Sequence, residues 1–128
     1  MSPESSAGTG PTAGPPETLP TQVPNSFWCD VSRERDAASV RPLGELDLAT
    51  VPILAGGVAH LRKAGCRHLI FDLSQLGFID SSGLRFLLEC HAESRQHGFT
   101  MALVPGPPAV QMVFELTGTT NRLPFIDP

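Results

Sequence analysis

A chain of 128 residues is long enough for one domain and too short for two. Its net charge of −4, with one tryptophan and no tyrosine, argues against the basic, aromatic surface that binds nucleic acid. The sequence contains no apolar run of about 18 residues that would predict a membrane span, and its amino terminus lacks the pattern of a signal peptide. We therefore expect a cytoplasmic protein that contacts neither nucleic acid nor membrane.

Residues 1–25 differ in composition from the rest of the chain. They hold six of the 13 prolines and no lysine or arginine, and most of the other residues are serine, threonine, glycine and alanine. Such a segment cannot bury enough apolar surface to offset the entropy lost on ordering. We expect a disordered tail over residues 1–25 and a folding unit over residues 26–128.

The first half of the folding unit is expected to contain two strands, a helix and a third strand. Residues 26–33 and 37–46 read as strands, and Pro42 suggests that the second strand lies at an edge or contains a bulge. A helix should begin near Thr50, its candidate cap, and should end before Gly65. Residues 67–73 are apolar enough to form a central strand.

Two adjacent glycines, Gly56 and Gly57, fall inside that expected helix. Each costs about 1 kcal/mol relative to alanine in a helix interior. The pair indicates either close packing against this helix or a weak helix.

The second half should contain two helices and two strands. A helix is expected over residues 82–96, with an apolar face and a stop at Gly98. A strand over residues 100–105 should precede a short helix that begins at Pro107 and ends at Gly118, and R-L-P-F-I could add a last strand. The order β-β-α-β-α-β-α-β predicts an α/β fold with a parallel or mixed sheet.

The stretch F-I-D-S-S-G-L, residues 78–84, leads from the turn at Gly77 into the longer helix. Ser82 would lie in the first helical turn with no bulk in front of it, because a glycine follows. A hydroxyl there could accept a phosphoryl group in line, and a helix amino terminus tolerates negative charge. Aspartate and serine are also the commonest helix caps, so the motif could be a cap and nothing more. We expect Ser81 to point toward the cap and Ser82 to face solvent.

The cysteines and histidines show no pattern of a metal or disulfide site. The three cysteines are widely spaced and odd in number, which favours buried apolar side chains. The four histidines lack ligand spacing. No cofactor or metal is therefore expected. The residues in question are Cys29, Cys66, Cys90, His60, His68, His91 and His97.

Three motifs together resemble those of STAS domains, in particular the bacterial anti-sigma factor antagonists. They are G-E-L-D at residues 44–47, F-I-D-S-S-G-L at 78–84 and P-P-A-V-Q-M-V-F-E-L-T-G at 107–118. The resemblance covers about residues 26–126 and implies a mixed sheet with helices packed on one side. Members of the family usually continue into a C-terminal helix, and we expect no such helix here.

The resemblance also implies a phosphorylation switch. In the family, the second serine of D-S-S-G is phosphorylated, and that position is Ser82 here. The unphosphorylated form binds an anti-sigma factor that is a serine kinase, which frees a sigma factor, and a serine phosphatase reverses the modification. The site would include the neighbours of this serine, Asp80, Ser81 and Gly83. The acids of G-E-L-D, Glu45 and Asp47, would be either part of a functional patch or a solvated turn.

Two other functions fit parts of the sequence. Ser82, His91 and Asp80 are the residue types of a hydrolase triad, but nine positions on one helix separate the serine from the histidine by about 13 Å. A nucleophile and its base need about 3 Å, so catalysis is not expected. A STAS subunit of a scaffold or transport complex, never phosphorylated, is the stronger alternative.

Overall fold

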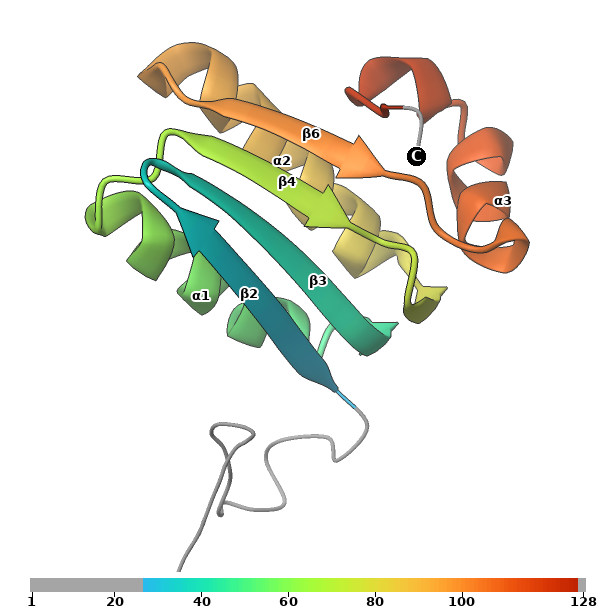
Figure 1. Ribbon diagram of the computed structural model, residues 1–128. Coiled ribbons are helices and arrows are strands. Elements are labelled where there is room, and N and C mark those ends of the chain that lie inside the picture. Colours follow the sequence, from blue (N-terminus) through green and yellow to red (C-terminus); the bar gives the residue numbers. More distant parts are fainter. Residues whose placement is uncertain (1–26, 127–128) are drawn as a thin grey trace, which may run out of the picture.

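A mixed sheet of five strands forms the centre of the computed structural model, which describes residues 27–126 (Figure 1). The strand order is β2-β3-β4-β6, and β5 pairs with the end of β3. The β2–β3 pair is antiparallel, while β3–β4, β4–β6 and β3–β5 are parallel. The strands are β2 (Trp28–Glu34), β3 (Ala37–Leu46), β4 (His68–Asp72), β5 (Leu76–Ile79) and β6 (Thr100–Val104).

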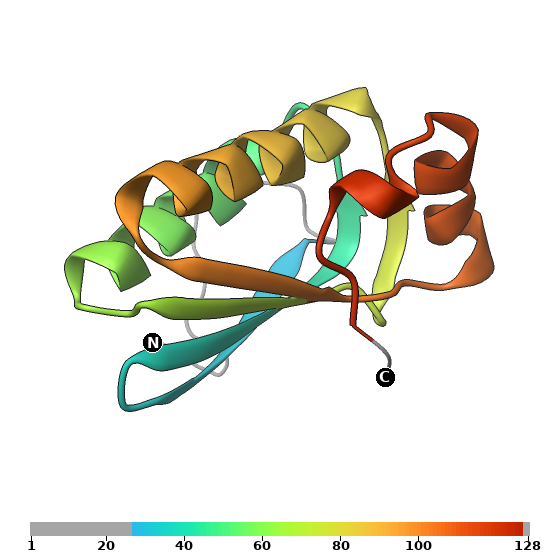
Figure 2. The same ribbon diagram turned by 90° about the horizontal axis from the view of Figure 1, so that it is seen from above.

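The two longer helices cover one face of this sheet, as Figure 2 shows. They are α1 (Val51–Lys63) and α2 (Ser81–His97), while the shorter α3 (Pro108–Leu116) packs beside β5. A 3₁₀ turn, η2 (Thr120–Arg122), follows α3. The expected α/β class, the mixed sheet and the helices on one side of it are all found. None of the described helices is long and apolar enough to cross a membrane.

The core lies between the sheet and these helices. Alternate residues of the central strands are buried there, which is the two-residue period of a strand with one covered face. Leu69 and Phe71 of β4 are buried in this way, whereas Ile70 between them points to the face without helices. The longest helix contributes Leu84 and Leu87 from its apolar face. The expected apolar stripe is therefore part of the core.

The strand predictions were wrong at two places. Residues Leu76–Ile79 form β5, which the predicted order omitted. The expected last strand is reduced to a single bridge between Leu103 and Phe125. Both segments are too short to be predicted from their own sequence. Whether such a short segment forms a strand depends on the strand beside which it lies.

Pro42 does not mark an edge strand, because β3 has neighbours on both sides. It is fully buried and is paired in register with Cys29 of β2. On the other side, β4 pairs with β3 up to Val40 and β5 pairs from Gly44 onward. The proline therefore lies between the part of β3 that pairs with β4 and the part that pairs with β5, so its missing N–H interrupts neither of these pairings. The only irregularity in the described β3 registers is between Gly44 and Glu45.

The predicted helix ends agree with the structure. Gly98 closes α2 in the left-handed conformation, with φ of 73°, and Gly118 follows α3 with φ of 70°. Within residues 27–126, no helix follows η2. The expected tail over residues 1–25 and the last two residues lie outside the described part of the chain.

Candidate functional site

The D-S-S-G motif lies where β3 and β5 end side by side. Leu46, the last residue of β3, pairs with Ile79, the last residue of β5. The backbone N–H of Asp80 donates to the carbonyl oxygen of Leu46 at 3.1 Å. Asp47 and Asp80 therefore leave the same edge of the sheet from neighbouring strands. The G-E-L-D and D-S-S-G motifs therefore meet at this edge.

Asp80 is the N-cap of α2, as predicted. Its Oδ1 accepts hydrogen bonds from the backbone N–H groups of Ser82 at 2.8 Å and Gly83 at 3.1 Å. These are two of the N–H groups that have no partner inside the helix. Because the carboxylate already binds both groups, they are not free to neutralise another anion at this helix end.

Gly83 brings the first turn of α2 into contact with the end of β3. A Cβ atom at this position would lie 2.8 Å from the carbonyl oxygen of Leu46 and 2.8 Å from Cγ1 of Ile79. No side chain fits at such distances without moving the backbone. The glycine of D-S-S-G is therefore required by close packing, and it fixes how the serines are presented.

Asp47 holds a turn and does not point freely into solvent. Its Oδ1 accepts from the backbone N–H groups of Ala49 at 3.0 Å and Thr50 at 3.1 Å. The buried hydroxyl of Thr50 donates to the carbonyl oxygen of Glu45 at 2.7 Å and accepts from the N–H of Asp47 at 2.9 Å. Thr50 therefore occupies the N-cap position of α1 as expected, but its side chain bonds back to the preceding loop.

The two serines differ from the expectation about their exposure. Ser81 is exposed and Ser82 is half-buried. The expected orientation, with Ser82 the more exposed residue, is therefore wrong. Which serine accepts a phosphoryl group stays a prediction.

Exposed apolar side chains flank the motif, and sequence reasoning missed them. Leu48, directly after Asp47, is 76% exposed, and Phe78, two residues before Asp80, is 47% exposed. Glu45, which pairs with Phe78 across β3 and β5, is exposed as well. Their positions beside the two motifs were a usable signal. The surface around the serines is thus partly apolar and partly acidic, which suits a protein partner.

Among residues 27–126, no group of three or more histidine, cysteine, aspartate or glutamate side chains is arranged to hold a metal ion. The described cysteines are free, and Cys66 and Cys90 are buried while Cys29 is half-buried. The predicted role of the cysteines as small apolar side chains is confirmed for the two buried residues.

Comparison with known proteins agrees with this geometry. The chain is 28% identical over 99 residues to an anti-sigma F factor antagonist of Paenibacillus polymyxa, covering 77% of this chain and 85% of that one. An anti-sigma factor antagonist from Mycobacterium paratuberculosis is 25% identical with a TM-score of 0.66, over 80% of this chain and 87% of that one.

A third relative shares the fold. It is the Bacillus cell fate determinant SpoIIAA in its phosphorylated form, with 22% identity and a TM-score of 0.61, over 80% of this chain and 90% of that one. The family model for the STAS domain matches residues 30–127, which include all of the sheet except the first two residues of β2, the three helices and the D-S-S-G motif. The chain belongs to the STAS domain family, and it resembles the anti-sigma factor antagonists within it.

Proposed function

We propose that this protein is a cytoplasmic anti-sigma factor antagonist controlled by phosphorylation of Ser82. The unphosphorylated form binds an anti-sigma factor that is also a serine kinase, and the bound sigma factor is released. Transfer of a phosphoryl group to Ser82 ends this binding, and a serine phosphatase restores it. The observation that carries the proposal is the position of D-S-S-G, with Asp80 as the N-cap of α2 and Ser82 in the first helical turn.

The surroundings of Ser82 support a switch driven by charge. A phosphoserine carries about −1.5 to −2 charges at neutral pH. The N–H groups of Ser82 and Gly83 are bonded to Asp80, so they give the phosphate little compensation. Glu45 and Asp47 lie at the same sheet edge. The added charge would therefore remain on the surface, where a partner that covers the motif must desolvate it.

The proposed contact also uses the apolar neighbours of the motif. Leu48 follows Asp47 and Phe78 lies two residues before Asp80, and both side chains are exposed. Burial of these side chains against the anti-sigma factor would supply binding energy, since apolar area contributes about 25 cal/mol per Å². A phosphate beside them would oppose that burial.

The test is a binding titration with the cognate anti-sigma factor kinase, with and without ATP. Ser82→Ala should bind like the wild type in the absence of ATP and should take up no phosphate. Ser82→Asp should bind about a hundredfold more weakly, because a carboxylate buried without a partner costs a few kcal/mol. Mass spectrometry of the ATP-treated wild type should place one phosphate on Ser82.

Matched variants at the neighbouring serine serve as the control. Ser81→Ala should still accept phosphate, and Ser81→Asp should fold equally well, since both serines lie in the first turn of α2. Phosphate found on Ser81 would refute the assignment to Ser82. If wild type takes up no phosphate and both Ser82 variants bind normally, a scaffold role replaces the switch.

A further inference from the structure

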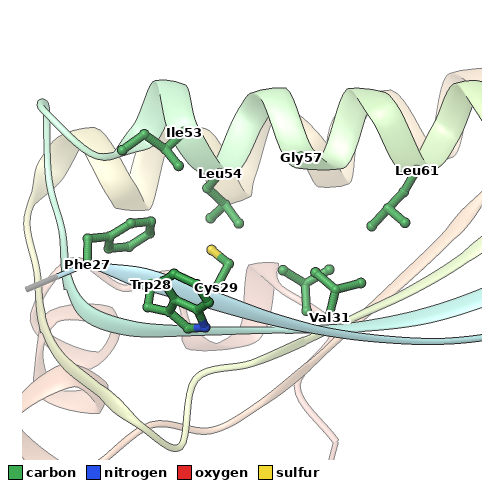
Figure 3. Close-up of a pocket in the computed structure, with 9 residues that line it drawn as sticks. Phe27, Trp28, Cys29, Val31, Ile53, Leu54, Gly57 and Leu61 are labelled. Carbon is green, nitrogen blue, oxygen red and sulfur yellow. The ribbon is translucent and has the colours of Figure 1, made fainter. Parts of the chain in front are cut away.

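An apolar groove lies between β2, an edge strand, and helix α1 (Figure 3). Its volume is about 430 Å³. Cys29 and Val31 line it from the strand, and Ile53, Gly57 and Leu61 line it from the helix. No charged side chain lines the groove, and burial raises the pKa of the Cys29 thiol to about 11, so the thiol is neutral. The groove therefore favours an apolar occupant.

The rim of the groove is unusually exposed for apolar residues. Val31 is 52% exposed and Ile53 is 38% exposed, on facing sides of the opening. Within residues 27–126, no strand pairs with the outer edge of β2. The edge strand β2 has exposed apolar side chains and no proline, and its charged residues are Asp30, Arg33 and Glu34. An edge strand without proline offers its free N–H and C=O groups to another strand.

The β2–β3 register shows which backbone groups of β2 point outward. A two-residue turn joins the strands, so Glu34 and Ala37, which flank it, form a hydrogen-bonded pair. Such pairs alternate with unbonded pairs along an antiparallel ladder, which makes Cys29–Pro42 an unbonded pair. Pro42 has no N–H to donate, so the assignment is consistent. The N–H and C=O groups of Cys29 and Val31 therefore point away from β3, at the free edge.

Gly57 leaves space on the helix side of the same groove. A Cβ atom added there would meet nothing within 4 Å, so no packing within residues 27–126 explains the glycine. A glycine inside a helix costs about 1 kcal/mol relative to alanine. Space at this position is useful if another helix or strand approaches α1 from outside.

We propose that the outer edge of β2 and this groove form the interface of a homodimer. In it, β2 pairs antiparallel with β2 of a second copy, about a twofold axis at Val31. The sheet continues through both copies, and the two α1 helices lie next to each other on the same face. The outward groups of Cys29 and Val31 gain hydrogen-bond partners, and the apolar rim is covered.

The sequence of β2 is complementary to itself in this register. Val31 faces Val31 of the second copy, while Asp30 faces a serine, Ser32 of the second copy. Arg33 faces Cys29 of the second copy, and its guanidinium is already held by the carbonyl oxygen of Ala64 at 2.7 Å. No like charges lie directly opposite each other, which would destabilise the pairing. This self-complementarity is what selects a second copy as the occupant.

The first test is the association state of the full chain by sedimentation velocity over a range of concentrations. The wild type should shift from monomer to dimer as concentration rises. Val31→Glu places two carboxylates opposite each other and should weaken association by at least about tenfold. Leu116→Glu, at an exposed apolar position on α3, is the matched control and should leave association unchanged.

The second test fixes the register. In a hydrogen-bonded antiparallel pair the Cα atoms are about 5.5 Å apart, within the range that a disulfide spans. Val31→Cys should therefore form a disulfide with residue 31 of the second copy on mild oxidation. Ser32→Cys should not, because the two copies of residue 32 would lie diagonally, about 7–8 Å apart. A wild type that stays monomeric at every soluble concentration, or a crosslink favouring residue 32, overturns the proposal.

Discussion

Replacement of Gly83 by alanine tests the contact that positions the candidate site. The added Cβ would lie 2.8 Å from the carbonyl oxygen of Leu46, 2.9 Å from its Cγ and 2.8 Å from Cγ1 of Ile79. Both neighbours are almost fully buried, and both end strands of the sheet. The side-chain contacts could relax, but the backbone oxygen cannot move without displacing the end of β3.

Two destabilising contributions and one stabilising contribution decide the size of the effect. Overpacking of a close-packed interior costs about 1–3 kcal/mol, and the same displacement strains the hydrogen bond from Asp80 to Leu46, worth about 1 kcal/mol. Alanine favours the helix over glycine by about 1 kcal/mol. We therefore expect Gly83→Ala to lower the free energy of unfolding by about 1–3 kcal/mol.

Urea denaturation followed by circular dichroism measures this free energy. Gly56→Ala is the matched control, since it is the same substitution in a helix where the new Cβ meets nothing within 4 Å. The control should raise the free energy of unfolding by up to about 1 kcal/mol. If Gly83→Ala is as stable as the wild type, the close approach of α2 to β3 does not require glycine and the reasoning fails.

Three further predictions concern residues around the site and the core. Asp80→Ala should lower the free energy of unfolding by about 1 kcal/mol through loss of the cap, while Asp80→Asn should lower it much less; equal losses in thermal melts would contradict the capping role. Thr50→Val should lower the free energy of unfolding by about 1–3 kcal/mol, because it leaves the carbonyl of Glu45 and the N–H of Asp47 without their hydroxyl partner. An unchanged midpoint of urea denaturation would refute this. Burial raises the pKa values of Cys29 and Cys90 from 9.0 to about 11, so each thiolate is about a hundredfold scarcer at pH 8. Iodoacetamide should therefore alkylate both thiols slowly until urea unfolds the protein, and equal rates in the folded and unfolded protein would contradict this.

The elements with local signals were predicted well from the sequence. The predicted and observed ends of α2 differ by one residue at each end, because Asp80 and Gly98 mark its two caps. The strand β5 was omitted because four residues with a glycine inside carry little signal of their own. It forms because the end of β3 offers it a partner, and that information is not local.

The site was predicted in its composition but not in its orientation. Asp47 and Asp80 meet because β3 pairs with β5 and the last residues of the two strands lie side by side, a pairing that the predicted strand order did not contain. The exposure of Ser81 and Ser82 depends instead on the direction in which α2 leaves the sheet. Gly83 packs the first turn of α2 against Leu46 and Ile79, and this contact depends on the paired strand ends as well as on the motif.

The half-buried position of Ser82 bears on how the proposed switch would operate. A fully exposed phosphate would be hydrated and could turn away from an approaching partner. Ser82 is instead held in a rigid first turn, with Asp80 bonded to its N–H and Gly83 packed on β3. A phosphate there would find the N–H groups of Ser82 and Gly83 already bonded to Asp80. The features that make the helix start rigid would thus direct the added charge at whatever protein covers Leu48 and Phe78.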